Sequence, residues 1–290
     1  MNILVTGAGS RIGQAVIKLI KKSKKNISIF STDYFPDSVG FYWSNSFEIL
    51  PEQLINNHSK WLKVIEKIII KNKINMIIPG IDFELSIFSK YKNYLEKKHN
   101  LICLVSNYEE IDNFNNKLKT YKFLLSKGIS VPKTSILNKK DLFIKENGYP
   151  VVIKPIIGST SKGLLYINNS RELKNHKLNN KKYIIQEKLS GFEVTSGAII
   201  FDKKIFSLIN LRRNLRNGNT HSATLYVNKK IDIFINKIVK NTNFYGPINF
   251  QLFYNKGKIK LIEINPRFSG TSYSRSFFGL NEFDIIIVKI

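Results

Sequence analysis

The stretch GPINFQLFYNKGKIKLIEINPR, from Gly246 to Arg267, decides the fold of this chain. Asn249–Tyr254 and Lys258–Ile264 are rich in aromatic and branched residues, which favour β-strands. The Asn-Lys-Gly sequence at residues 255–257 is typical of a tight turn. The pattern therefore predicts a β-hairpin.

The pairing of the two strands decides which side chains share a face. Symmetry about Gly257 places Gln251 opposite Glu263 and Asn249 opposite Asn265. Side chains two apart on a strand share a face, so these four should project together. A bulge at the glycine would slip the pairing by one residue. The other face carries apolar side chains in imperfect alternation, as expected of a strand pair that covers a core: Phe250, Leu252, Leu261, Ile262 and Ile264.

The polar face of this hairpin is a candidate metal site. A carboxylate and amide oxygens around one centre suit Mg²⁺ or Mn²⁺, which take hard oxygen ligands. Glu263, Gln251 and Asn265 are the candidate ligands. Pro266 ends the strand, and the planar donor fork of Arg267 could then hold a phosphoryl group during its transfer. The alternative is an ordinary amphipathic hairpin with a solvated polar face.

A second candidate phosphate site surrounds Lys154. Tyr149–Lys154 is typical of a short buried strand, and the sequence GSTSKG follows at Gly158–Gly163. Glycines around small hydroxyl residues let backbone N–H groups approach phosphate oxygens, so Gly158, Ser159 and Gly163 are candidates, with charge from Lys154 and Lys162. The loop is not a Walker A motif, because two leucines follow Gly163. A flexible surface turn would use the same residues.

A third segment, Tyr183–Glu193, offers contacts for a nucleoside. An apolar strand runs into Gln186, Glu187 and Leu189, whose amide, carboxylate and apolar groups suit the edge of a purine ring. Glu193 could accept hydrogen bonds from a ribose. Each feature alone is more often a strand end with solvated charges.

The order of these features resembles the ATP-grasp superfamily over nearly the whole chain. The glutamine at the first metal position and the E-x-N-P-R ending are most similar to carbamoyl-phosphate-synthase large-subunit-like ligases. The resemblance implies that two subdomains grip ATP, with the glycine-rich loop as a lid. It implies the following roles: phosphate contacts from Lys117 and Lys154, adenine contacts from Glu187 and Leu189, ribose contact from Glu193, magnesium ligands at Gln251, Glu263 and Asn265, and stabilisation of the γ-phosphoryl group by Arg267.

The first hundred residues favour a doubly wound sheet. Met1–Val5 is a short apolar strand, GAGSRIG follows, and Gln14–Lys22 is typical of a helix. The glycine spacing is GxGxxxG, not the GxGxxG of dinucleotide-binding folds, and a short-chain dehydrogenase pattern fails at Arg11. Asp33 nevertheless lies at the distance of a ribose-binding acid, so NAD(P) binding by a reductase is an alternative.

This segment also resembles the pre-ATP-grasp domain of the same relatives, on the sequences ILVTGAG, TD at residues 32–33 and IIPGIDFEL at residues 77–85. In those relatives the domain helps to form the acceptor-substrate site. The expected fold class is α/β followed by α+β. A Rossmann-like pre-ATP-grasp domain (residues 1–112) precedes an ATP-grasp domain (residues 113–290), with a lid at about 120–186 and a larger subdomain at about 187–290.

Two further segments are candidates for substrate contacts. Residues 211–224, LRRNLRNGNTHSAT, form a basic stretch in which Arg213 and Arg216 could meet an acidic acceptor or the triphosphate. A solvated basic loop is an equal alternative. Ser269 and Arg275 follow the metal strand closely and could contact a substrate carboxylate.

Composition limits the remaining possibilities. The formal charge is +25 in 290 residues, but lysine is spread along the chain without a nucleic-acid-binding motif, so we expect no nucleic-acid partner. The lone Cys103 excludes an internal disulfide. Neither a signal peptide nor a membrane span is evident, which makes the cytoplasm the expected location.

The leading functional hypothesis is an ATP-dependent ligase that joins a carboxylate to an amine through an acyl phosphate, with an oligomer left open. Gln251 stands where many ATP-grasp ligases have glutamate, which leaves open whether one or two metals bind. An ATP-binding protein without ligase turnover and a nicotinamide-dependent reductase are the alternatives.

Overall fold

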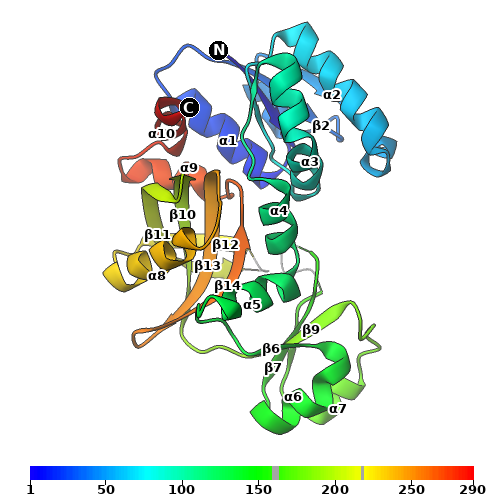
Figure 1. The fold of residues 1–290 in the computed structure, drawn as a ribbon, viewed down its shortest axis with the longest axis vertical. Coiled ribbons are helices and arrows are strands. Elements are labelled where there is room, and N and C mark those ends of the chain that lie inside the picture. Colours follow the sequence, from blue (N-terminus) through cyan, green and yellow to red (C-terminus); the bar gives the residue numbers. More distant parts are fainter. Residues whose placement is uncertain (159–162, 217–218) are drawn as a thin grey trace.

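The computed structural model describes residues 1–158, 163–216 and 219–290, and its described strands form three sheets. Figure 1 shows these sheets along the long axis of the molecule, with the N-terminal sheet at one end and the small lid at the other. None of the helices in these ranges is long and apolar enough to cross a membrane.

The N-terminal sheet is parallel, with the strand order β3-β2-β1-β4-β5. Its elements are β1 (Asn2–Thr6), α1 (Arg11–Lys22), β2 (Ser28–Asp33), η1 (Val39–Trp43), β3 (Ser46–Ile49), η2 (Glu52–Asn56), α2 (His58–Asn72), β4 (Met76–Ile78), α3 (Asp82–His99) and β5 (Ile102–Cys103). Alternate residues of β1 enter two different cores, because Ile3 packs with Val16 of α1 whereas Leu4 packs with Trp61 of α2 and Phe88 of α3. Helices therefore cover both faces, which confirms the doubly wound prediction.

The space beside the glycine-rich loop after β1 is filled by other parts of the protein. Gly9 N donates to Asp33 Oδ2 at 2.7 Å, and Tyr34 N donates to Asp33 Oδ1 at 2.7 Å. The 3₁₀ helix η1 lies on the loop so closely that a Cβ on Gly40 would come within 2.3 Å of Ala8 O. Because the acid and the space above the loop are already used, this arrangement argues against the NAD(P)-binding alternative.

The lid is a small antiparallel sheet with the order β6-β9-β7-β8. Two helices, α4 (Tyr108–Asn115) and α5 (Lys117–Ser126), lead into it. The lid elements are β6 (Thr134–Ile136), η3 (Leu137–Lys139), α6 (Lys140–Asn147), β7 (Val151–Pro155), β8 (Leu165–Ile167), α7 (Ser170–Lys174) and β9 (Tyr183–Glu187). Leu124 of α5 packs into the core of the larger subdomain, whereas the lid's own core begins at Leu137, so α5 lies outside the lid although the expected lid began near residue 120.

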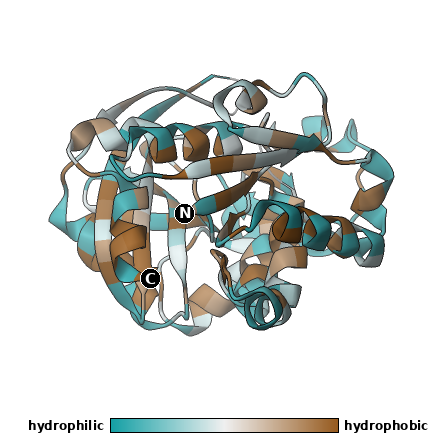
Figure 2. Cartoon of the chain, turned by 90° about the horizontal axis from the view of Figure 1, so that it is seen from above, coloured by the Kyte–Doolittle hydropathy of each residue, from teal (hydrophilic) through white to brown (hydrophobic). Residues whose placement is uncertain are grey.

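The larger sheet is antiparallel, with the order β12-β11-β10-β13-β14. Its segment comprises β10 (Phe192–Phe201), β11 (Lys204–Arg216), β12 (Asn219–Leu225), α8 (Lys229–Lys240), β13 (Gly246–Asn255), β14 (Lys258–Asn265), α9 (Ser272–Arg275), η4 (Ser276–Phe278) and α10 (Glu282–Lys289). Ile231 and Ile235 of α8 pack on Phe250 of β13, which buries one face of this sheet. Phe283 of α10 instead joins the core around α1, so the chain returns to the N-terminal domain. Bands of hydrophobic and hydrophilic residues alternate along the helices in Figure 2, as expected where one side of each helix faces a core.

The β13–β14 hairpin has the predicted pairs, but it is not symmetric about Gly257. Lys256 and Gly257 form a two-residue turn with φ of 46° and 85°, and Asn255 pairs with Lys258. The register shifts by one residue further along, where Ile262 has no partner of its own. This bulge also explains the imperfect apolar alternation, since Leu261 is buried while Ile262 is only half-buried.

Candidate active site

The polar face of the larger sheet carries the three predicted metal ligands. Beyond the bulge, Gln251 pairs with Glu263 and Asn249 pairs with Asn265, as predicted. Thr195 of β10 pairs with Gln251 from the other side and donates its hydroxyl to Asn249 Oδ1 at 2.8 Å. The opposite face of the hairpin lies in the core. One buried and one polar face thus follow from strand alternation and place these side chains together.

Arg267 continues this face and is held by three hydrogen bonds. Its Nε donates to Asp82 Oδ1 at 2.7 Å, its Nη1 to Phe268 O at 3.0 Å and its Nη2 to Asn265 Oδ1 at 3.2 Å. Asp82 belongs to the N-terminal domain, and the sequence contained it within IIPGIDFEL without assigning it a role in the site. Its place directly after the carboxyl end of β4 is the signal that marks it, because ligands of open α/β sheets bind at those ends.

Lys154, on β7 of the lid, interacts electrostatically with Glu263 and Glu193 of the larger sheet. Burial lowers the pKa of Lys154 to about 8, while the charge of Glu263 raises it, Lys117 lowers it and Glu193 raises it. An ammonium that is only 9% exposed and interacts with both glutamates lies near the polar face of the larger sheet. The lid and the hairpin therefore meet at one charged site.

Lys117 forms hydrogen bonds with the backbone that leads into the glycine-rich loop. Its Nζ donates to Gly158 O at 2.6 Å, and its backbone N donates to Ile156 O at 2.9 Å. Gly158 and Gly163 have φ of 144° and 77°, which favour glycine at both ends of the loop. Ser159 and Lys162 lie outside the described residues.

The predicted adenine segment lies where the lid joins the larger subdomain. Gln186 is buried and donates its Nε2 to Thr134 Oγ1 at 2.7 Å. The Glu187 carboxylate accepts from Lys133 N at 2.7 Å and forms an ion pair with Lys260 of β14. Leu189 is half-buried in the connection that follows. The end of β9 is therefore tied by polar contacts to the start of β6 in the lid and to β14 of the larger sheet.

Arg213 lies between two of the predicted site residues. Its Nη2 is 2.5 Å from Glu193 Oε2 and donates to Gln251 Oε1 at 2.9 Å. The predicted ribose acceptor and the first predicted metal ligand are thus joined by one guanidinium. Arg216 is exposed at the end of β11.

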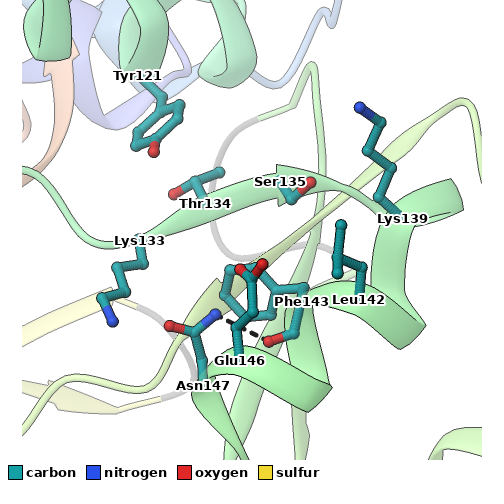
Figure 3. Close-up of a pocket in the computed structure, with 9 residues that line it drawn as sticks. All are labelled: Tyr121, Lys133, Thr134, Ser135, Lys139, Leu142, Phe143, Glu146 and Asn147. Carbon is teal, nitrogen blue, oxygen red and sulfur yellow. Dashed lines mark hydrogen bonds between the residues drawn. The ribbon is translucent and has the colours of Figure 1, made fainter.

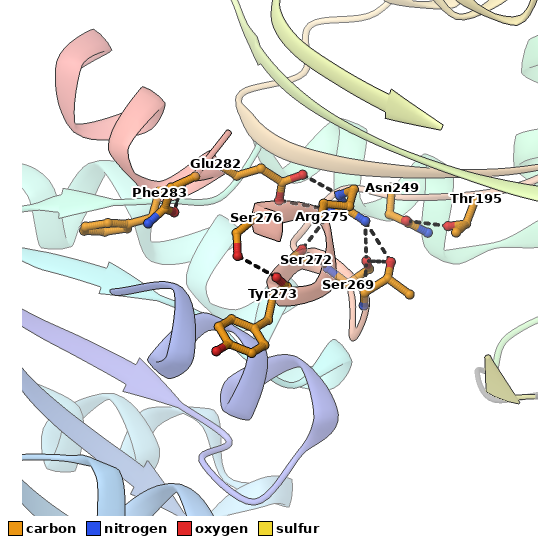
Figure 4. A network of polar contacts seen from close by, with 11 residues as sticks. Thr195, Asn249, Ser269, Ser272, Tyr273, Arg275, Ser276, Glu282 and Phe283 are labelled. Carbon is orange, nitrogen blue, oxygen red and sulfur yellow. Dashed lines mark hydrogen bonds and ion pairs between the residues drawn. The ribbon is translucent and has the colours of Figure 1, made fainter. Parts of the chain in front are cut away.

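Ser269 and Arg275 belong to a buried network that Figure 4 shows. Arg275 is 1% exposed and pairs with the fully buried Glu282, with Nε 2.5 Å from Oε1. The same guanidinium donates to Ser269 Oγ at 3.0 Å and to Thr271 Oγ1 at 2.7 Å. The expectation that Arg275 and Ser269 contact a substrate carboxylate does not agree with this arrangement, because their polar groups are directed at each other and away from solvent.

The hairpin residues fit a hard divalent cation. Glu263 offers a carboxylate, and Gln251 and Asn265 offer amide oxygens that accept from Arg213 and Arg267 in this structure and have a second lone pair for a cation. Asn265 Nδ2 is buried and has no hydrogen-bond partner among the described atoms, so a phosphate oxygen at this point would satisfy it. Across the described ranges no group of three or more His, Cys, Asp or Glu residues could hold a metal ion.

A hollow of about 310 Å³ lies elsewhere, on the lid. Figure 3 shows the residues that line it: Tyr121, Lys133, Thr134, Ser135, Lys139, Leu142, Phe143, Glu146 and Asn147. These residues are distinct from the predicted site residues, and Lys133 and Glu146 bring charges of both signs to it.

Comparisons with known proteins agree with this architecture. A family model described as PylC-like, N-terminal domain, matches residues 3–102. The carbamoyl phosphate synthase large chain of Clostridium botulinum (strain Loch Maree / Type A3) is 26% identical over 297 residues, which cover 93% of this chain and 27% of that protein. The same enzyme of Pseudothermotoga lettingae is 26% identical over 195 residues, 60% of this chain and 18% of the relative. The chain thus spans less than a third of the length of these relatives.

Solved structures share the whole fold. An N5-carboxyaminoimidazole synthetase from Staphylococcus aureus complexed with ADP has a TM-score of 0.75 at 19% identity, covering 99% of this chain and 76% of that one. An L-amino acid ligase from Bacillus licheniformis has a TM-score of 0.70 at 16% identity, covering 95% and 69%. A model described as ATP-grasp domain matches residues 114–271, more than half of the chain. The chain therefore belongs to the ATP-grasp family.

Proposed function

We propose that this protein is an ATP-dependent ligase that joins a carboxylate to an amine through an acyl phosphate. The observation that supports the proposal is the electrostatic interaction of the buried Lys154 on the lid with Glu263 on the hairpin, whose end also carries the hydrogen-bonded guanidinium of Arg267. Cations from two elements around a carboxylate-amide donor set form a site for a metal-bound triphosphate. We place the protein in the cytoplasm because ATP is its proposed substrate.

Within this proposal, each site residue has one task. Gln251, Glu263 and Asn265 would hold Mg²⁺ or Mn²⁺, and Lys154 and Lys117 would contact phosphates. The segment Gln186–Leu189 would line the adenine, and Glu193 the ribose. Arg213 would release Glu193 or Gln251 when nucleotide binds and would then be free to contact the triphosphate.

The chemistry requires position and countercharge. A carboxylate oxygen of the acceptor attacks the γ-phosphorus, the bond to the β,γ-bridging oxygen breaks, and ADP leaves. The amine nitrogen then attacks the acyl carbon, inorganic phosphate leaves, and the amine loses a proton. Bound divalent metal supplies additional countercharge to the phosphates. Arg267 and Lys154 stabilise the negative charge of the migrating group, and closure of the lid excludes water that would hydrolyse the acyl phosphate.

The N-terminal domain is the proposed location of the acceptor. Arg267 lies at its boundary, because Asp82 at the start of α3 accepts its Nε hydrogen. The strand ends of β1 and β4 lie beside this contact, since Gly80 N donates to Thr6 Oγ1 at 3.3 Å. A small carboxylate bound at these strand ends would stand next to Arg267.

Hydroxylamine trapping tests the proposal. Purified protein is incubated with ATP, Mg²⁺, hydroxylamine and a panel of carboxylic acids, and both ADP and hydroxamate are measured. A ligase gives both products in a carboxylate-dependent manner, because hydroxylamine intercepts an acyl phosphate. Glu263→Ala and Arg267→Ala should abolish both products while circular dichroism shows an intact fold.

Other outcomes point to the alternatives. Nucleotide binding without ADP release in any panel would indicate an ATP-binding protein without turnover. Retention of NAD but not of ATP would favour the reductase. Normal turnover in either alanine variant would contradict the site assignment.

A further inference from the structure

We propose that Asp82 is a positioning residue that orients the guanidinium of Arg267 for phosphoryl transfer and thereby couples the N-terminal domain to the ATP-grasp site. The inference rests on the proposed function, because it gives Arg267 the role of contacting the γ-phosphoryl group. The two residues are 185 positions apart in the sequence and lie in different domains, so the contact exists only in the assembled fold.

The guanidinium of Arg267 is fixed in its plane. An arginine has five N–H donors in a rigid fork. Hydrogen bonds to Asp82, Phe268 O and Asn265 engage one donor on each of the three nitrogens. Within the described ranges, one N–H on each Nη atom remains for a ligand, and its direction is set by the three bonds already made. Asp82 makes the only bond of the three in which both partners are charged, so it is the strongest of these constraints.

Partial burial makes this constraint effective. The Arg267 side chain is 12% exposed and the Asp82 side chain is 33% exposed, so the ion pair is partly shielded from water. A partly shielded pair is screened less by salt than a surface pair. Rotation of the guanidinium away from Asp82 would break this partly shielded ion pair.

Asp82 is itself rigidly mounted. It is the first residue of α3, an 18-residue helix. The preceding turn is clamped, because Ser10 Oγ donates to Gly80 O at 2.7 Å and a Cβ on Gly80 would lie 2.2 Å from Thr6 O. The first turn of α3 is also anchored on its buried side, where Glu84 accepts a hydrogen bond from Tyr34 Oη at 3.0 Å. The position of Asp82 is therefore set by the strand ends at which the proposed acceptor would bind.

A positioning role and a simple domain-docking role for Asp82 predict different effects on ligand binding. A docking ion pair would contribute to stability but would not discriminate between ADP and a complex that resembles the transferring phosphoryl group. A positioning residue affects the second complex, since only there does the aim of the two free N–H groups matter. Mg²⁺-ADP with aluminium fluoride supplies such a complex without knowledge of the acceptor.

The experiment compares Asp82→Asn with the wild-type protein and with Asp141→Asn, which makes the same change in the first turn of an exposed helix of the lid. Calorimetry measures the affinity for Mg²⁺-ADP with and without aluminium fluoride. We expect Asp82→Asn to bind Mg²⁺-ADP within about 2-fold of wild type but to lose about 100-fold in affinity for the aluminium fluoride complex, the size of effect that follows a small misplacement of a reacting geometry. Asp141→Asn should match wild type in its affinity for Mg²⁺-ADP both with and without aluminium fluoride.

A second arm asks whether Asp82 acts through Arg267. The Arg267→Lys background lacks the guanidinium. In that background, Asp82→Asn should lower the affinity for the aluminium fluoride complex by less than about 3-fold, because the interaction that Asp82→Asn removes is already lost. Two results would overturn the inference. One is that Asp82→Asn lowers affinity equally in the wild-type and Arg267→Lys backgrounds, and the other is that it lowers affinity equally for Mg²⁺-ADP with and without aluminium fluoride. Failure of the proposed ligase is separate: absence of hydroxamate in wild type contradicts that function, while selective loss of the aluminium fluoride complex in Asp82→Asn still supports the positioning role.

Discussion

Lys154 shows how a single residue can make nucleotide binding depend on pH. Desolvation lowers the pKa of its ammonium to about 8, against the opposing effect of Glu263. A triphosphate bound beside it would add negative charge and would raise this pKa. In the proposed site the protonated form would contact phosphate, so nucleotide binding and protonation of Lys154 would favour each other.

The first prediction follows from this linkage. Near pH 8.5 free Lys154 is mostly neutral, so binding of Mg²⁺-ADP should take up a fraction of a proton, and affinity should fall as the pH rises above about 8. Calorimetry in buffers of different ionisation enthalpy measures the uptake. Lys154→Met should remove the uptake, and the exposed Lys229→Met should leave it unchanged. Equal uptake in wild type and Lys154→Met would contradict this account.

At the residue scale, the sequence grouped side chains that are neighbours along the chain and missed contacts between residues that are far apart in it. Glu263, Asn265 and Arg267 lie within five positions, so strand alternation alone grouped them. Asp82 could not be paired with Arg267 by any spacing rule, since the contact crosses 185 positions. The substrate roles expected of Ser269 and Arg275 did not foresee Glu282, whose buried carboxylate binds the Arg275 guanidinium.

At the element scale, the hairpin and its neighbour β10 form the frame of the site. The pairs Gln251 with Glu263 and Asn249 with Asn265 were predictable, because alternation limits the register to alternatives one residue apart. The bulge at Ile262 was not, since the choice between a bulge and a longer turn depends on how β14 packs against α4 and α5. Gly197 of β10 adds a constraint of another kind, because the Arg275 guanidinium lies directly against it.

The second prediction concerns this close approach. A Cβ on Gly197 would lie 2.1 Å from Arg275 Cζ, so Gly197→Ala must displace a buried guanidinium from Glu282. Breaking a buried ion pair costs about 3–5 kcal/mol of unfolding free energy, which denaturant titration measures. Gly279→Ala is the control: its Cβ meets open space, and only the strain of its φ of 96° costs about 1 kcal/mol. Equal losses in the two variants would show that Arg275 moves freely.

At the scale of the whole molecule, the candidate site takes residues from three parts of the fold. The N-terminal domain supplies Asp82 at the start of α3, the lid supplies Lys154, and the larger sheet supplies the hairpin. The doubly wound domain and the two-subdomain ATP-grasp fold were predictable from motif order. The exact limits of the lid were not, because α5 and α10 choose their partners by packing: Leu124 joins the larger core and Phe283 the N-terminal core.

The central claim is that a divalent cation and a nucleotide meet at the hairpin, and electron paramagnetic resonance of Mn²⁺ tests it most directly. In the presence of a non-hydrolysable ATP analogue, wild type should bind Mn²⁺, and Glu263→Gln should weaken that binding by at least about 10-fold. The exposed Glu109→Gln serves as the control and should bind as wild type does. Unchanged Mn²⁺ affinity in Glu263→Gln would contradict the account.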